Sequence, residues 1–180
     1  MKFHLVIIFI FIFVNKINAM DLLYKDKLEN FSQKWEFLSD QVMGGISSGK
    51  FEILDGDKGN FIRLSGNVST KNNGGFIQLR SFFDFEEKNF KGIRIKAKGF
   101  PSDYYIHIRT NFLLMPWQYY SGRFEVSENW ETYEILFRDF EKSNFYQPSN
   151  FGSSEIKSIG FVAFGKDFQP KLDIIEAELF

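Results

Sequence analysis

The feature that most constrains the fold is an alternation of apolar and polar side chains along short segments. Between residues 93 and 98, isoleucine or alanine alternates with arginine or lysine, and residues 104–109 alternate in a similar way. Successive side chains of a β-strand point to opposite faces, so a period of two predicts a strand with one buried and one solvated face. Each of these segments therefore predicts a half-buried strand.

Other apolar segments are separated by clusters of turn residues. Residues 51–54 and 61–64 flank the sequence DGDKGN, a glycine-rich connection that is typical of a hairpin. Further strands are predicted at residues 76–80, 119–126, 130–137, 158–164 and 171–179. The longest irregular stretch, residues 139–154, is expected to cross one end of the fold. Eight or nine short strands without a long helix predict an all-β sandwich or barrel.

The length and composition of the chain suit one domain with a single core. It has 180 residues, and 24 of them are phenylalanine, a residue type that favours pleated, half-buried surfaces. We expect one β-sandwich domain over residues 35–180, with phenylalanine, isoleucine and the rings of Trp35 and Trp130 in its core. Residues 20–34 are expected to form a tether or a short helix that leads into this domain.

The first 19 residues resemble a secretory signal peptide. Lys2 supplies a positive charge, residues 5–14 are ten consecutive apolar residues, and Ala19 offers a small residue for cleavage. Ten residues span about 15 Å as a helix, half of a bilayer core, so a transmembrane anchor is the weaker interpretation. We therefore expect export to a periplasmic or other extracytoplasmic compartment. The alternatives are a membrane tether through an uncleaved leader and a mitochondrial location.

The residue types that the chain lacks exclude several classes of function. It has no cysteine, which rules out disulfides, zinc–thiolate sites and iron–sulfur clusters. His4 lies in the predicted leader, so His107 is the one histidine left for acid–base or metal chemistry. A formal net charge of −1 argues against nucleic acid as a partner, because phosphate binding needs an excess of lysine and arginine. We predict no catalytic residue, no cofactor and no metal.

Two glycine-rich segments are the most distinctive local motifs. In residues 40–47, DQVMGGIS, Gly44 and Gly45 allow a positive φ or a close approach of two chain segments. We predict a tight turn with a structural role, because no strand-to-helix elbow surrounds Ser47 to support a nucleophile. Residues 72–75, NNGG, are likewise predicted to form a turn, since no helix follows them to favour phosphate binding.

A candidate binding face follows from polar and aromatic side chains on neighbouring predicted strands. They are Gln78 and Arg80 on one strand, Tyr105, His107 and Arg109 on the next, and Trp117 and Tyr119 beyond it. If the sheet brings these strands together, two guanidiniums, an amide and an imidazole converge beside an aromatic platform. That combination suits recognition of a sugar, a carboxylate or a protein surface. The alternative is a solvated sheet face with Trp117 packed under a loop.

The two glycine segments, taken in order, resemble a known family. The residues that carry the resemblance are Trp35, Asp40, Met43, Gly44 and Gly45, followed by Asn73, Gly74 and Gly75. This pair of motifs is similar to that of the complex I intermediate-associated protein 30 family, and residues 156–161 and 172–175 resemble its last two strands. The resemblance covers residues 35–180 and implies a jelly-roll sandwich of the galactose-binding-domain type.

The resemblance also implies a non-catalytic role, which in mitochondrial members is that of an assembly factor for NADH:ubiquinone oxidoreductase. We therefore expect a binding or chaperone-like module that docks on a protein partner, such as a subunit of a respiratory complex. The second hypothesis is an exported carbohydrate-binding module, because the fold, the aromatic platform and the predicted leader all suit one. Mitochondrial members carry transit peptides whereas this leader looks secretory, so the fold carries over more directly than the function.

Overall fold

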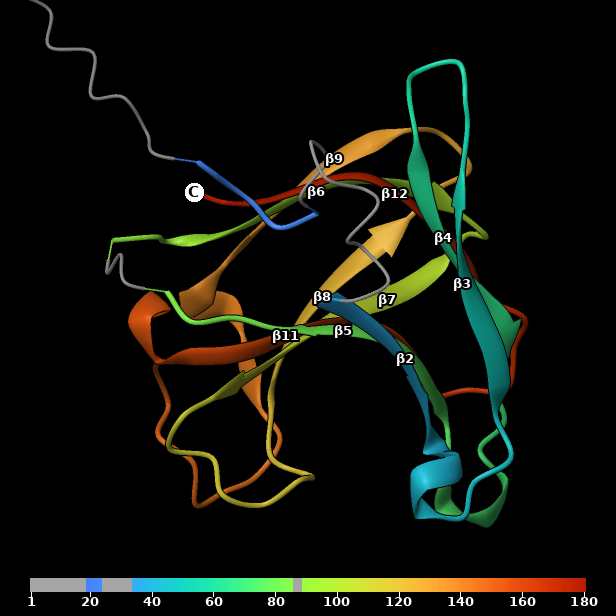
Figure 1. Cartoon of the computed structure of the whole chain (residues 1–180). Coiled ribbons are helices and arrows are strands. Elements are labelled where there is room, and N and C mark those ends of the chain that lie inside the picture. Colours follow the sequence, from blue (N-terminus) through green and yellow to red (C-terminus); the bar gives the residue numbers. More distant parts are fainter. Residues whose placement is uncertain (1–18, 24–33, 86–88) are drawn as a thin grey trace, which may run out of the picture.

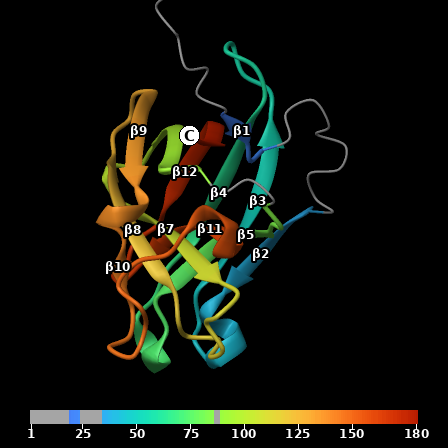
Figure 2. The same ribbon diagram turned by 90° about the vertical axis from the view of Figure 1, so that its left-hand side faces the viewer.

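The computed structural model describes residues 19–23, 34–85 and 89–180. Most of the predicted leader, residues 1–18, and residues 24–33 of the predicted tether lie outside the described residues. The described residues fold into two antiparallel sheets packed face to face, as Figures 1 and 2 show from two sides. The predicted all-β sandwich is confirmed. No helix in the described part of the chain has the length and hydrophobicity that crossing a bilayer requires.

The first sheet, called sheet A, contains the predicted hairpin and the C-terminal strand. Its strands are β1 (Met20–Asp21), β3 (Ser48–Leu54), β4 (Phe61–Asn67), β6 (Gly92–Gly99), β9 (Glu131–Leu136) and β12 (Lys171–Leu179). Their order is β3–β4–β12–β6–β9, and β1 also pairs with β12. β1 lies in the stretch expected to be a tether or helix, and Leu22 and Leu23 directly after it are buried in the core. At these positions the chain is therefore part of the sandwich.

The second sheet, called sheet B, carries the strands on which the binding face was predicted. Its strands are β2 (Trp35–Ser39), β5 (Phe76–Phe82), β7 (Ser102–Thr110), β8 (Tyr120–Val126), β10 (Glu141–Lys142) and β11 (Ile156–Phe164). Their order is β10–β8–β7–β11–β5–β2. In the described part of the chain, four short 3-10 turns connect the strands: η2 (Asp40–Met43), η3 (Lys71–Asn73), η4 (Phe137–Asp139) and η5 (Ser153–Glu155).

The core lies between the sheets and is built from aliphatic and aromatic side chains. Trp35 of β2 is fully buried there, as predicted, and its ring stacks on that of Phe161 with centroids 5.3 Å apart. Trp130 differs from the prediction, because it lies half-buried on the outer side of sheet A. Phe61 points to that side, since Ile62 next to it faces the core, and Trp130 packs edge-on against Phe61. The ammonium group of Lys98 lies over the Trp130 ring, 5.0 Å from its centre.

Loops at both ends of the sheet B strands extend past that sheet, on the side away from β6 and β12 (Figures 1 and 2). At one end are residues 111–119, between β7 and β8, and residues 143–152, between β10 and η5. At the other end are η2 and η3. The outer face of sheet B therefore lies between two sets of loops.

Candidate functional site

The two glycine motifs meet around the buried carboxylate of Asp40. One Asp40 oxygen accepts a hydrogen bond from the backbone nitrogen of Ser47 at 2.9 Å. The other oxygen accepts from the Ser47 hydroxyl and from the backbone nitrogen of Gly75, both at 2.5 Å, and from the nitrogen of Phe76 at 3.3 Å. Because Asp40 directly follows β2 and Gly75 directly precedes β5, the carboxylate joins the ends of two paired strands.

These contacts stabilise the ionised form of Asp40. Burial alone would raise the pKa of this carboxyl, but the hydrogen bonds from Ser47, Gly75 and Phe76 lower it below its usual value. The Ser47 hydroxyl also accepts a hydrogen bond from the backbone nitrogen of Ser69, at 2.9 Å. The motif thereby connects the chain after β2, the chain before β3 and the connection between β4 and β5.

The glycines of the motif are required for two different reasons. Gly44 has a φ of 89°, in the left-handed region that favours glycine. Gly45 lies against Asp40, and a Cβ added there would approach the Asp40 Cβ to 2.7 Å. A Cβ on Gly74 would likewise come within 2.8 Å of the Asp40 Cγ. Asn73 has a φ of 57°, which completes the turn before β5. Met43, in contrast, is mostly exposed.

The strand register brings the predicted binding residues together on the outer face of sheet B. Gly160 of β11 pairs with Arg80 of β5 on one side and with His107 of β7 on the other. In the neighbouring row, Val162 pairs with Gln78 and with Tyr105 in the same way. The convergence that the sequence predicted only conditionally is thus present.

Both guanidiniums on this face already have partners. Arg80 donates to one carboxylate oxygen of Glu36 from Nε at 2.9 Å and from Nη2 at 2.5 Å. Arg109 donates from Nη2 to the carbonyl oxygens of Leu113 and Met115, at 3.1 and 3.0 Å. Burial lowers the pKa of Arg109, and the charge of Arg80 lowers it further. The two guanidiniums therefore lie near each other, and that of Arg80 is already paired with the Glu36 carboxylate.

The aromatic residues divide into a packed group and an exposed one. Tyr119 stacks on the His107 ring with centroids 4.0 Å apart, and Phe164 packs edge-on against both His107 and Tyr105. This cover buries His107, and burial lowers its pKa to about 3. His107 is consequently neutral at physiological pH. Trp117 lies in the loop after β7 and is 59% exposed, so it is not packed under that loop.

The chemistry available on this face is recognition by planar polar and aromatic groups. Among the described residues, His107 Nε2 has no hydrogen-bond partner, and no three acidic or histidine side chains gather to hold a metal. The sequence analysis missed Gly160, over which the Gln78 side chain lies: a Cβ at Gly160 would meet the Gln78 Cδ at 2.7 Å. A glycine inside a strand signals such a close approach, so this feature was accessible from the sequence.

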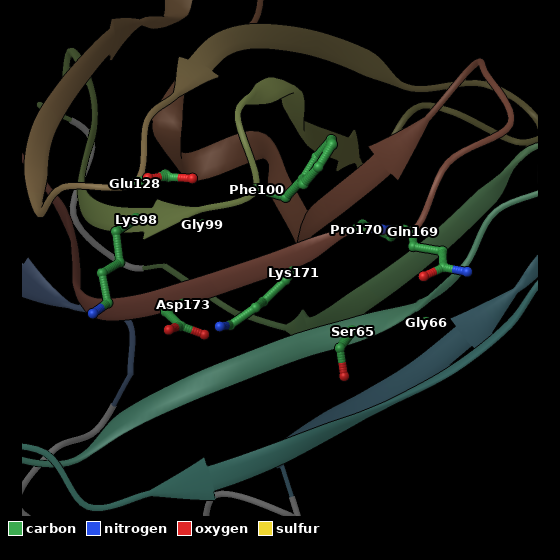
Figure 3. Close-up of a pocket in the computed structure, with 10 residues that line it drawn as sticks. All are labelled: Ser65, Gly66, Lys98, Gly99, Phe100, Glu128, Gln169, Pro170, Lys171 and Asp173. Carbon is green, nitrogen blue, oxygen red and sulfur yellow. The ribbon is translucent and has the colours of Figure 1, made fainter.

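A separate pocket of about 560 Å³ lies on the outer side of sheet A (Figure 3). The buried Asp173 forms its floor, with both carboxylate oxygens bound to Arg63 at 2.6 and 2.7 Å. Figure 3 shows Lys98 and Lys171 on either side of Asp173. None of the predicted binding residues lines this pocket.

Comparison with protein families identifies the chain. A family model described as complex I intermediate-associated protein 30 matches residues 23–174. The chain belongs to this family. The match includes both glycine motifs and the strands of the outer face of sheet B, so the resemblance drawn from these motifs is confirmed. No curated protein matches the sequence.

Solved structures show which sandwich the family fold resembles. A family 11 carbohydrate-binding module of the cellulosomal cellulase Lic26A-Cel5E of Clostridium thermocellum is 18% identical, with a TM-score of 0.64; the match covers 82% of this chain and 87% of that one. A family 11 module from Clostridium thermocellum in complex with a β-1,3-1,4-mixed-linked tetrasaccharide is 19% identical, with a TM-score of 0.63, and the match covers 82% of this chain and 88% of that one. The agarase AgWH50C is 11% identical, with a TM-score of 0.56, and the match covers 89% of this chain and 24% of that one. The jelly-roll β-sandwich expected from the sequence is confirmed, and at these identities the likeness extends to the fold alone.

Proposed function

We propose that the protein is a non-catalytic binding module that docks on its partner through the outer face of sheet B. The observation that carries this proposal is the row of Arg80, Gly160 and His107 across three strands, with Gln78 and Tyr119 beside it. Planar polar and aromatic side chains of this kind are frequent in recognition surfaces. The neutral His107 ring is stacked under Tyr119, and among the described residues its Nε2 has no hydrogen-bond partner, so it serves here as part of a packed recognition surface.

The partner we propose is a protein subunit of a membrane complex, in a role like that of a complex I assembly factor. The family description supports this choice. A carboxylate on the docking surface would suit the planar donors of Arg80 and could exchange with Glu36, its present partner.

Affinity purification of the tagged full chain from membranes, followed by mass spectrometry, tests this function. We expect the wild type to enrich subunits of one complex and Arg80→Ala to reduce the enrichment at least about tenfold. The Arg80 side chain is 21% exposed and pairs with Glu36, so its replacement should lower the melting temperature modestly while the fold is kept, which thermal unfolding checks. Arg94→Ala, at an arginine of sheet A that is 31% exposed and paired with Glu134, is the matched control. Equal enrichment by the wild type and by Arg80→Ala would show that the partner does not dock on the outer face of sheet B.

A carbohydrate ligand is the second candidate, because similar solved structures are carbohydrate-binding modules and one of them holds a tetrasaccharide. Tyr105, Tyr119 and Gln78 would then contact a sugar through ring faces and amide hydrogen bonds. A glycan array separates the two candidates: the protein-docking function gives no hits. Hits that Tyr119→Ala abolishes would instead establish the sugar-binding function.

We also propose that the chain is exported, on the basis of the apolar run that ends before Ala19. Cell fractionation with determination of the mature N-terminus tests this location. A chain that starts at Met1 in the cytoplasmic fraction would contradict it.

A further inference from the structure

Two neighbouring loops at one end of sheet B expose a group of large apolar side chains. The loops are residues 111–119 and residues 143–152. The exposed side chains, called the apolar loop patch, are Leu114 (83% exposed), Met115 (46%), Trp117 (59%), Phe145 (84%) and Tyr146 (87%). Large apolar groups that gather on a surface in this way mark a site of interaction.

Hydrogen bonds fasten the two loops to each other. The backbone nitrogen of Ser143 donates to the carbonyl oxygen of Tyr119 at 2.9 Å, and the nitrogen of Tyr119 donates to the Ser143 hydroxyl at 3.0 Å. The buried Gln147 adds a bond from its amide nitrogen to the Tyr119 carbonyl, at 3.0 Å. The patch is therefore one surface built by the fold, and not the sum of two independent loops.

Neither loop contains a charged residue. The sequence of residues 111–119 is NFLLMPWQY and that of residues 143–152 is SNFYQPSNFG. An interface with a protein usually has a polar or charged rim around its apolar centre. An uncharged tip suits lipid, because a charge that enters a bilayer carries a large free-energy penalty.

Cationic side chains stand at the base of both loops and bind their carbonyl groups. Arg109 donates to two carbonyl oxygens of the first loop, at 3.1 and 3.0 Å. Lys142 donates to two carbonyl oxygens of the second loop, both at 3.2 Å. Carbonyl groups that approach a bilayer need such donors because hydrocarbon supplies none. The same cations can pair with lipid phosphates.

We propose that the apolar loop patch inserts into the interfacial region of a phospholipid bilayer and places the domain on a membrane surface. Tryptophan and tyrosine favour this region, and leucine, methionine and phenylalanine add apolar area to the contact. The proposal goes beyond the partner proposed above and does not depend on its identity. A domain held at a membrane would, however, meet a membrane-complex subunit at a raised local concentration.

The opposite end of sheet B offers a second contact point. Val42 and Met43 of η2 are both more than half exposed. Figures 1 and 2 show η2 and the two loops extending to the same side of the molecule. Contact at both ends would bring the outer face of sheet B toward the bilayer, so a partner that docks on this face would do so at the membrane surface.

Fluorescence quenching by vesicles of brominated phosphatidylcholine and phosphatidylglycerol, in equal parts, tests the proposal on the full chain. The predicted leader is itself apolar, so sedimentation with vesicles alone does not identify the contact. Quenching of Trp117 identifies the apolar loop patch as the contact, because brominated acyl chains quench only tryptophan that reaches them. We expect the emission to be quenched in the wild type and the quenching to be lost in Trp117→Phe, which keeps an aromatic ring but removes the reporter.

A second pair of variants separates membrane contact from misfolding. Leu114→Ser with Phe145→Ser should weaken the quenching titration at least about tenfold, since two large apolar contacts are removed. Phe100→Ser is the matched control, because Phe100 is 51% exposed and lies near the other end of β7. Absence of quenching in the wild type, or equal quenching in the double variant, would overturn the proposal. Quenching seen only with vesicles that contain membrane proteins would assign the patch to a protein and overturn it as well.

Discussion

The carboxylate of Asp40 accepts a 2.5 Å hydrogen bond from the backbone nitrogen of Gly75, which lies 35 residues further along the chain. This bond turns the two glycine motifs of the family into one structural unit. Gly45 and Gly74 both lie against the same carboxylate, so the spacing of the motifs reflects a single buried anion. The motif positions the ends of β2 and β5, and β5 in turn carries Gln78 and Arg80.

Replacement of Asp40 by asparagine should strongly destabilise the fold. The new amide group would place a donor where the Asp40 carboxylate now accepts hydrogen bonds from Ser47, Gly75 and Phe76. A buried donor left without an acceptor costs about 1 to 3 kcal/mol, so we expect the free energy of unfolding to fall by about 3 kcal/mol. Urea denaturation measures this, with Asp57→Asn in the exposed hairpin loop as control. Equal stability of the two variants would contradict the role of Asp40.

The same carboxylate should add to acid sensitivity. The pKa of Asp40 is lower in the fold than the ordinary value of 3.8, so the unfolded chain binds its proton first as the pH falls. The stability that Asp40 contributes is fully present above that ordinary value and is lost as the pH falls through the lower pKa of the fold. Below about pH 4 the wild type should therefore lose stability more steeply than Asp40→Asn. Parallel curves of unfolding free energy against pH would refute this expectation.

Alanine substitutions should distinguish the two glycines of the turn. At Gly44 an added Cβ meets nothing within 4 Å, so the cost is that of a positive φ, about 1 kcal/mol. At Gly45 the Cβ would collide with the Asp40 side chain, and such overpacking costs up to about 3 kcal/mol. We expect Gly45→Ala to lower the melting temperature clearly more than Gly44→Ala in thermal unfolding. The reverse order would mean that backbone strain dominates this turn.

The sequence predicts the strands well because alternation and turn residues are local signals. The bounds of β12 agree with the prediction, and β6 and β7 bury the faces that their alternation indicates. Alternation identifies the face of a strand but not what covers it. Trp130 was therefore expected in the core although it packs on Phe61 outside sheet A. His107 was expected to be solvated, although Tyr119 and Phe164 cover it.

Long-range contacts account for the rest of what the sequence could not predict. Nothing local to Asp40 indicates that its carboxylate accepts hydrogen bonds from Gly75 and Phe76, at the start of β5. The bonds from Arg109 to loop carbonyls depend on how the chain after β7 turns back, which composition does not specify. The register that joins Arg80 to His107 runs through β11, which follows both of these strands in the sequence.

His107 should make stability depend on pH in a range where the carboxylates stay ionised. Burial lowers the pKa of His107 to about 3 in the fold, whereas its value in the unfolded chain is 6.5. Between these two pH values only the unfolded chain protonates His107. Stability should therefore fall as the pH drops below 6.5, by about 2 kcal/mol at pH 5. His107→Gln should be less stable at pH 7 but should lack this dependence. A variant that keeps the slope would show that another group titrates there.

Replacement of Arg109 by methionine should loosen the loop after β7 while the sandwich stays folded. The aliphatic stem is retained, but the two bonds to the carbonyls of Leu113 and Met115 are lost. Hydrogen bonds from a charged group contribute about 1.5 to 3 kcal/mol each, and partial exposure of Arg109 reduces that value.

Hydrogen exchange can report on this loop because two of its amides close turns within it. Leu113 N donates to the carbonyl of Thr110 at 3.2 Å, and Gln118 N donates to that of Met115 at 3.1 Å. In Arg109→Met we expect both amides to exchange at least about tenfold faster, which corresponds to a local loss of about 1.4 kcal/mol. Amides of β5 and β11 should keep their protection, since the Arg109 guanidinium donates to the loop carbonyls of Leu113 and Met115. Arg109→Lys, which keeps the charge but not the paired donors, should behave like the methionine variant. Unchanged exchange in both variants would show that the loop holds its conformation without Arg109.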